Sequence, residues 1–169
     1  MKSEFIYFAD KEIEKYIPKL KRKMVYPFWS NGRWTLHDLL SYILKKTGPA
    51  KVHLSTFSIS EVAIRSLANE INQGKITELN CLFDYTNQIN KLQILYFTSN
   101  IATEIKLAKN HAKLILIENK DWKISIVGSA NLSPNPRYET GVILTDPLIF
   151  NTYLRFFMAT MNESKQTML

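Results

Sequence analysis

The chain has 169 residues, enough for one domain with a substantial hydrophobic core, and we expect a single domain over residues 1–169. A hydrophobic content of 46% and a charged content of 22% are ordinary for a soluble globular protein, and a single cysteine excludes an internal disulfide framework. The net charge of +7 favours a polyanionic partner, with nucleic acid ahead of an anionic membrane surface.

Membrane, secretory and zinc-binding proteins are not expected. No run approaches the roughly 18 apolar residues that a membrane span needs. The start, Met1 to Phe5, has no basic end followed by a long apolar stretch, so we expect no signal peptide and a cytoplasmic location. One thiol without a cysteine–histidine cluster argues against a structural zinc site. Cys81 lies in an apolar, strand-like run, and we expect it to be a buried packing residue.

Residues 1–34 form a basic and aromatic segment, with a short helix expected over residues 11–17. The aromatic side chains Tyr26, Phe28 and Trp29 follow a run of cationic residues. They could stack on nucleic-acid bases while the cations neutralise backbone phosphates. They could also belong to the hydrophobic core or to a dimer interface, and this second interpretation is favoured.

Helices and strands alternate in the next part of the chain. Thr35 and Asp38 form a capping-box pattern at the start of a helix with an apolar stripe, which Gly48 and Pro49 end. The elements expected after it are a strand over residues 52–58, a helix over residues 61–73 and a strand over residues 76–83. A strand–helix–strand unit of this kind is typically parallel.

The second half of the chain completes the expected fold. Its expected elements are a helix over residues 88–97, a strand over residues 101–107, a hairpin of residues 111–118 and 122–128, a strand over residues 141–145, and a helix that begins at Asp146-Pro147. The tail over residues 164–169 is expected to fray. These elements predict an α/β fold with a mixed, mostly parallel β-sheet and helices on both faces.

The expected hairpin carries the main functional signal. His111 and Lys113 stand two residues apart at the start of its first strand, so strand alternation would place both side chains on one face. The second strand ends at Gly128, and the turn after it contains Ser129 and Asn131. An imidazole, an ammonium, a hydroxyl and an amide would therefore meet, which is the outline of a phosphate-handling site.

These residues resemble the signature of the phospholipase D superfamily. That signature consists of His-x-Lys, four residues, Asp, six residues, and then Gly-Ser/Gly-x-Asn, and it is matched here from His111 to Asn131. The strand–helix–strand unit over residues 52–83 fits the same fold. The resemblance thus implies a phospholipase D-like domain and covers roughly two-thirds of the chain.

The resemblance implies a role for each matching residue. His111 would attack the phosphorus of a phosphodiester and form a covalent phosphohistidine, which water then hydrolyses. Lys113, Ser129 and Asn131 would bind the non-bridging oxygens and stabilise the charge of the transition state. Gly128 has no Cβ atom, so the phosphate could approach the backbone closely.

A downstream carboxylate is also implied by the resemblance. Glu139 would accept a hydrogen bond from the other ring nitrogen of His111 and so fix the tautomer of the imidazole. No metal and no cofactor are called for, since the lysine and the polar donors stabilise the charge. His37 and His53 have no lysine two residues after them, and we interpret both as structural or surface residues.

The chain departs from the signature in two ways. Glu118 has the position of the aspartate when counted from His111, and Asp121 has it when counted from Gly128, so the hairpin is three residues longer than the pattern. The resemblance implies that this aspartate is mainly structural. The chain also has one His-x-Lys motif, whereas the usual mechanism needs a second histidine as general acid. Small single-motif bacterial nucleases of the family solve this by forming homodimers, so a homodimer is expected.

The expected function is that of a metal-independent phosphodiesterase, a homodimeric nuclease that hydrolyses DNA or RNA. Two alternatives stay open. One is a phospholipid phosphodiesterase of the same superfamily, and the other is a catalytically inactive nucleic-acid-binding subunit that keeps the fold. The short chain, its positive charge and the aromatic residues near basic ones favour nucleic acid over phospholipid.

Overall fold

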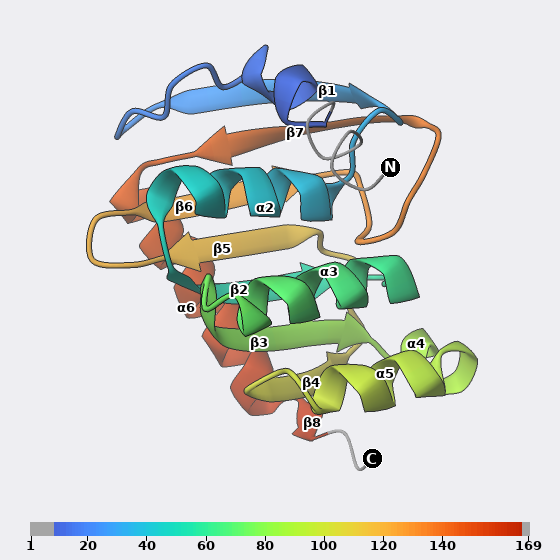
Figure 1. Ribbon diagram of the computed structural model, residues 1–169. Helices are drawn as coiled ribbons and strands as arrows, with labels where there is room; N and C mark the ends of the chain where they lie inside the picture. The colour runs from blue at the N-terminus through green and yellow to red at the C-terminus, as the bar shows by residue number, and fades with distance from the viewer. Residues whose placement is uncertain (1–8, 167–169) are drawn as a thin grey trace.

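The computed structural model describes residues 9–166, whose strands join into an eight-stranded mixed sheet with helices on both faces (Figure 1). Across the sheet the strands follow the order β1-β7-β6-β5-β2-β3-β4-β8. The strands are β1 (Val25–Asn31), β2 (Ala50–Thr56), β3 (Ile76–Asp84), β4 (Glu104–Ala108), β5 (Leu114–Glu118), β6 (Lys123–Gly128), β7 (Tyr138–Leu144) and β8 (Lys165–Gln166). The helices are α2 (Leu36–Thr47), α3 (Glu61–Asn72), α4 (Thr86–Asn90), α5 (Leu92–Ser99) and α6 (Pro147–Glu163), and residues 9–14 are also helical.

Side-chain caps set the starts of α2, α3 and α6, and those of α2 and α6 are the clearest in the sequence. The Thr35 hydroxyl accepts a hydrogen bond from the Asp38 amide at 3.2 Å, and the Asp38 carboxylate accepts one from the Thr35 amide at 2.8 Å. This is the predicted capping box. The Asp146 carboxylate accepts a hydrogen bond from the Leu148 amide at 2.8 Å, and Pro147 occupies the first position of α6. Both helices therefore begin where the sequence predicts.

The α/β class, the mixed sheet and the helices on both faces are confirmed, but the expectation of a mostly parallel sheet is wrong. Within the described residues, β2–β3 and β3–β4 are parallel, and the other five pairs of neighbouring strands are antiparallel. The two parallel pairs use crossover helices, as parallel strands require. In contrast, β5, β6 and β7 follow one another without an intervening helix, so each reverses the direction of the one before.

Two local predictions differ from the structure. Residues 25–31, for which no strand is expected, form β1 at the edge of the sheet, where Pro27 is tolerated because an edge needs fewer ladder hydrogen bonds. The helix expected over residues 88–97 is divided into α4 and α5 at Lys91. The Lys91 ammonium donates to the Ser58 hydroxyl at 2.6 Å, which ties the break to the loop after β2.

The ends of the chain are only partly described. The helix expected over residues 11–17 occurs over residues 9–14. Lys165–Gln166, which belong to the tail expected to fray, form the short strand β8. Residues 1–8 of the basic segment and residues 167–169 of the tail lie outside the described residues. No helix in the described part of the chain is both long enough and apolar enough to cross a membrane.

The sheet is packed against helices on both sides. α2, α3 and α5 cover one face, and α6 crosses the other (Figure 1). The smaller core, under α6, includes Phe150 and Phe157. Cys81 is buried as expected, and burial raises the pKa of its thiol. Of the aromatic N-terminal residues, Phe28 is buried in the larger core while Trp29 is 55% exposed, so this segment contributes to both core and surface.

One edge of the sheet brings distant loops together. β2, β3 and β6 end there and β5 and β7 begin there, on the right in Figure 1. We call this row of strand ends the site edge, which is distinct from the outer strands β1 and β8. The loops after Thr56, Asp84 and Gly128 meet at this edge, together with the segment between Ala108 and Leu114. Loops held by a rigid sheet in this way are common positions for functional side chains.

Candidate active site

His111 and Lys113 lie at the site edge, in the segment that joins β4 to β5. The strand expected to begin at His111 begins at Leu114 instead. The correction matters because strand alternation then cannot account for the proximity of the two side chains. Their arrangement comes from the hydrogen bonds of the residue that precedes them, Asn110.

Asn110 is buried and anchors this segment to the neighbouring strands. Its backbone amide donates to Asp84 Oδ2 at 2.9 Å, and its side-chain oxygen accepts a hydrogen bond from the Ala112 amide at 3.1 Å. Its side-chain amide donates to the Ser55 hydroxyl at 3.0 Å. The backbone is therefore fixed on both sides of His111, while the His111 side chain itself is exposed.

The Lys113 ammonium lies against the His111 imidazole. Lys113 Nζ is 3.1 Å from Nδ1 and 3.4 Å from Nε2 of the ring, and it donates to the His111 carbonyl at 2.8 Å. An atom nearly equidistant from both ring nitrogens at this range lies over the face of the ring, because a position in its plane would clash with Cε1. The ammonium thus brings positive charge to the face of the imidazole and does not occupy the plane of the ring, where nitrogen lone pairs point.

Phe57, the first residue after β2, completes this cluster. Its ring centroid is 4.9 Å from that of His111 and 5.6 Å from Lys113 Nζ. Burial lowers the pKa of Lys113, and the charge of the nearby Glu139 carboxylate opposes that shift. An ammonium that is partly removed from water and close to a ring is favourable for binding an anion at the same place.

The Gly128–Ser129 turn lies beside Lys113, whose carbonyl accepts a hydrogen bond from the Gly128 amide at 3.4 Å. The Ser129 hydroxyl donates to Glu139 Oε2 and accepts a hydrogen bond from the Thr140 amide at 3.1 Å. The hydroxyl is therefore held in place by β7. To donate to a phosphate oxygen it would have to exchange its bond to Glu139 for a new one.

Glu139 is joined to the turn and not to the imidazole. Its second carboxylate oxygen accepts a hydrogen bond from Asn135 Nδ2 at 2.8 Å. Among residues 9–166, no hydrogen bond connects Glu139 with His111. In this structure the carboxylate orients Ser129 and lies close enough to Lys113 to affect its pKa.

Packing alone requires glycine at position 128. A Cβ atom there would lie 2.8 Å from the Thr140 carbonyl oxygen. Gly128 is paired with Gly141 on β7, and a Cβ atom on Gly141 would lie 2.4 Å from a ring carbon of Phe28. The two glycines therefore let β6, β7 and the Phe28 ring come together. This reason is independent of a phosphate approaching the backbone.

Asn131 does not line the cavity beside His111. Its side-chain oxygen accepts a hydrogen bond from the Thr56 hydroxyl at 3.5 Å. Asn131 lines a small pocket together with Glu139 and Trp34, next to the start of α2. The structure thus brings His111, Lys113, Gly128 and Ser129 together directly, and it links Glu139 to them through Ser129.

A cavity of about 730 Å³ opens beside the imidazole, between the site edge and α6. His111, Lys113, Gly128 and Ser129 line it, and no carboxylate is among its lining residues in the described part of the chain. Its walls are otherwise largely apolar, and α6 contributes aromatic side chains. Over residues 9–166, no group of three or more His, Cys, Asp and Glu side chains is placed to hold a metal ion.

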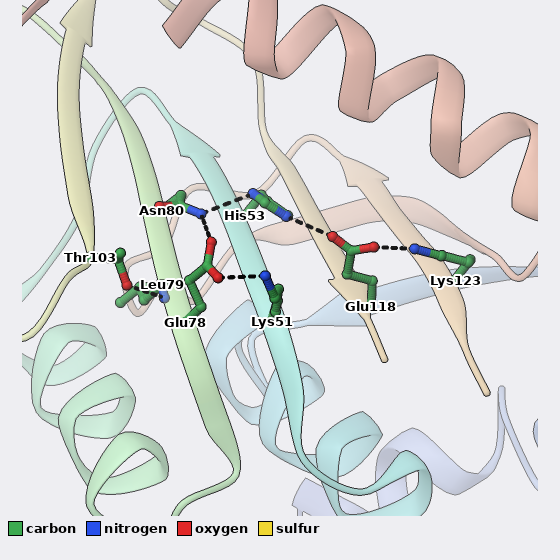
Figure 2. A network of polar contacts seen from close by, with 8 residues as sticks. All are labelled: Lys51, His53, Glu78, Leu79, Asn80, Thr103, Glu118 and Lys123. Atoms are coloured by element: carbon green, nitrogen blue, oxygen red, sulfur yellow. Dashed lines mark hydrogen bonds and ion pairs between the residues drawn. The ribbon is translucent and has the colours of Figure 1, made fainter. Parts of the chain in front are cut away.

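A second polar cluster lies at the other end of β5 (Figure 2). Glu118 forms an ion pair with Lys123 and lies 3.3 Å from His53 Nε2. Asn80 Nδ2 lies 3.3 Å from His53 Nδ1, so both ring nitrogens of this buried histidine have partners. Burial raises the pKa of Glu118, but the hydrogen bonds from Lys123 and His53 outweigh it and hold the pKa below its ordinary value.

Of the two acidic residues that match the aspartate of the signature, Glu118 has the structural contacts. Asp121 lies at the exposed tip of the hairpin, where Arg22 is 3.8 Å away. Neither carboxylate lines the cavity beside His111. His53 is thus structural, as interpreted from the sequence. His37 is likewise buried in α2, and burial lowers the pKa of its imidazole.

Sequence reasoning missed Phe57, Asn110 and Asp84. Each comes from the end of a different strand or from the loop after it, and they meet only through the order of the strands. The parallel pairing predicted for residues 52–83 is the one signal that points to them. It implies that residues just after the two strands share an edge, where ligands commonly bind in open α/β sheets.

No protein-family model matches the chain, and the comparison with curated proteins finds no match either. Solved structures do match. A phospholipase D family member, Nuc from Salmonella typhimurium, has a TM-score of 0.64 at 14% sequence identity. The match covers 85% of this chain and 97% of the Nuc chain. NucT from Helicobacter pylori has a TM-score of 0.66 at 20% identity, and the match covers 85% of this chain and 100% of the NucT chain.

A third match extends over almost the whole chain. TrmBL2, an archaeal chromatin protein described as showing a novel mode of DNA binding, has a TM-score of 0.59 at 10% identity. The match covers 98% of this chain and 64% of TrmBL2. At these identities the comparisons establish the architecture. The protein has the fold of the phospholipase D superfamily.

Proposed function

We propose that the protein is a metal-independent phosphodiesterase, a nuclease that hydrolyses DNA or RNA through a covalent phosphohistidine at a homodimeric site. One observation carries this proposal. The exposed imidazole of His111 lines a cavity whose described lining residues include no carboxylate, and the Lys113 ammonium lies over its ring, 3.1 Å from Nδ1. This arrangement supports the proposal, because one phosphate group could contact both the imidazole and the ammonium.

The chemistry follows from these two groups. An unprotonated ring nitrogen of His111 forms a bond to phosphorus as the bond from phosphorus to the leaving oxygen breaks, and that oxygen takes a proton from a general acid. Lys113 stabilises the negative charge on the non-bridging oxygens. Water then attacks the phosphorus, loses a proton to the conjugate base of the general acid, and displaces the imidazole.

The general acid is the reason for proposing a homodimer. The chain has three histidines, and His37 and His53 are both buried away from the cavity, with His53 hydrogen-bonded to Glu118. A second copy of His111, brought to the same phosphate by a two-fold axis, would supply the missing imidazole. Each subunit would then provide half of one site.

Nucleic acid is the proposed substrate class because of charge and surface chemistry. The chain has a net charge of +7, and Lys109 joins His111 and Lys113 among the residues that line the cavity. A groove with excess cations attracts the phosphates of a nucleic-acid backbone. The phospholipid alternative of the same superfamily remains a competing substrate class for the test below.

A non-catalytic nucleic-acid-binding subunit is a second candidate, favoured by a specific observation. The Ser129 hydroxyl is already bonded to Glu139, so one of the expected phosphate donors is occupied. The DNA-binding protein TrmBL2 also shares the fold. In that case the cavity would hold a phosphate without cleaving it.

Cleavage of labelled single- and double-stranded DNA and RNA in excess EDTA tests the proposal, with phosphatidylglycerol vesicles as the lipid arm. We expect nucleic-acid cleavage that persists in EDTA and is lost in His111→Ala, and a dimeric mass by light scattering. Leu148→Ala, at an exposed position of α6 outside the cavity, is the matched control. Cleavage that EDTA abolishes, turnover of lipid alone, or a monomeric active enzyme would each contradict the mechanism. DNA binding without cleavage would favour the second candidate.

A further inference from the structure

The cavity beside His111 is lined by two kinds of side chain. The polar part includes the cationic residues Lys109 and Lys113 and the His111 imidazole. The apolar part includes aromatic rings from α6, of which Phe157 is buried and Phe156 is exposed, and Tyr153 lies near them in the sequence of the same helix. A ligand that fits both parts carries an anionic group beside a flat, largely apolar ring.

Three side chains of α6 are available for contacts with a ligand: Tyr153, Arg155 and Phe156. The Tyr153 hydroxyl has no hydrogen-bond partner within the described part of the chain. Phe156 is 59% exposed, and Arg155 Cζ lies 5.6 Å from its centroid. Arg155 forms no ion pair with any of residues 9–166. An exposed ring next to an unpaired cation is the combination on which nucleic-acid bases stack.

We infer that this cavity is a base-binding subsite, which holds an unpaired base next to the phosphate that His111 attacks. The inference rests on the proposed function in one respect, that the scissile phosphate lies at His111. The cavity volume of about 730 Å³ falls in the usual range for small-ligand sites and accommodates a nucleoside. Phe156 and Tyr153 would contact the base, and Lys109 would neutralise an adjacent phosphate.

The subsite selects single-stranded nucleic acid. A base in a duplex is stacked and paired, so it can enter a cavity beside its own phosphate only after unpairing, which costs free energy. A single strand avoids most of that cost. We therefore expect binding to a single strand to exceed binding to the duplex of the same sequence by roughly 100-fold.

The test measures binding in the His111→Ala background, so that cleavage does not interfere, by fluorescence anisotropy of a labelled oligonucleotide. Adding Phe156→Ala should weaken single-strand binding roughly 10-fold, and duplex binding much less. Leu148→Ala is the matched control, because Leu148 is exposed on the same helix but does not line the cavity. Oligonucleotides with abasic residues should bind the Phe156→Ala protein and its parent equally.

The outcomes separate this inference from the proposed function. Equal binding of single strand and duplex, or a Phe156→Ala protein that binds the single strand as its parent does, would overturn the base-binding subsite even if the wild type is an EDTA-resistant nuclease. A wild type that cleaves no nucleic acid but shows the expected Phe156 dependence would instead overturn the proposed function alone. If Phe156→Ala weakens binding to phosphatidylglycerol vesicles but leaves oligonucleotide binding as in its parent, the cavity binds a lipid chain. That result would contradict the inference.

Discussion

Two histidines at opposite ends of the sheet have similar neighbours in sequence but different surroundings. His53 lies two residues after Lys51, and His111 lies two residues before Lys113. Around His53 the charges are paired: Lys51 bonds to Glu78 at 2.7 Å, and Glu118 bonds to both Lys123 and His53 (Figure 2). We call this set the closed network.

Among residues 9–166, the lining of the cavity beside His111 contains cationic side chains and no carboxylate. Lys109, His111 and Lys113 line this cavity. Glu139 does not line it, and its carboxylate accepts a hydrogen bond from the Ser129 hydroxyl. The comparison shows that residue types alone do not make a site. A charge that already has a buried partner stabilises the fold, whereas an accessible cation beside an open imidazole remains available to an anionic ligand.

The largest expected effect comes from exchanging the two histidines for alanine. His111→Ala should lower kcat/KM for nucleic acid by at least about 10⁴-fold, because the nucleophile is lost. Its free energy of unfolding should change by less than about 1 kcal/mol, since the side chain is exposed.

His53→Ala should show the reverse pattern. It should retain activity but lose about 2–3 kcal/mol of stability in urea unfolding, because Glu118 and Asn80 lose a buried partner. Loss of activity in folded His53→Ala, with activity retained in His111→Ala, would reverse the assignment of the two ends.

The lysines extend the comparison with a smaller effect. Lys113→Met should reduce kcat by about 10²–10³-fold, because the transition state loses a positively charged donor. Lys51→Met removes an exposed ion pair of the closed network and should leave kcat unchanged. Steady-state kinetics in EDTA measures both, and equal kcat values for the two variants would contradict the role given to Lys113.

Acid should weaken the closed network through Glu118. Its pKa in the folded protein lies below the ordinary value of 4.5, so the unfolded state binds more protons, and this stabilisation is present above that value. It is lost as pH falls through the lower, folded pKa. Glu118→Gln should cost about 2 kcal/mol at pH 7 and flatten the loss of stability below about pH 4.5, as measured by urea unfolding across pH. An unchanged acid profile would show that Glu118 is not the group responsible.

The smallest expected effect distinguishes the two acidic residues of the hairpin. Asp121→Asn should change stability by less than about 0.5 kcal/mol, because its contact with Arg22 at 3.8 Å is exposed. Thermal unfolding of Asp121→Asn and Glu118→Gln side by side measures the difference. A larger loss for Asp121→Asn would give it the structural position that we assign to Glu118.

Elements that depend on contacts between residues near in sequence are predictable from the sequence, and elements that depend on distant contacts are not. Helix starts at Thr35 and Asp146 depend on contacts within a few residues, and they are where the pattern predicts. β1 was missed because its partner is β7, more than a hundred residues away, and Pro27 obscures its strand pattern. The expected strand start at His111 was wrong because Asn110 bonds to β2 and β3, which the local sequence does not reveal.

The candidate site shows the same limit. The spacing from His111 to Ser129 suffices to predict that these residues meet, because a hairpin relates them. Phe57 could not be predicted as a neighbour of His111, since their contact depends on which strand lies beside β5. The bond between Ser129 and Glu139 likewise depends on the pairing of β6 with β7.

The configuration at phosphorus tests the central claim most directly. An oligonucleotide with one phosphorothioate linkage of known configuration is cleaved in isotopically labelled water with EDTA present, and the configuration of the product is determined. Two successive displacements, first by His111 and then by water, each invert the phosphorus, so the account predicts net retention. Net inversion would mean that water attacks the phosphodiester directly, and it would contradict a covalent phosphohistidine at His111.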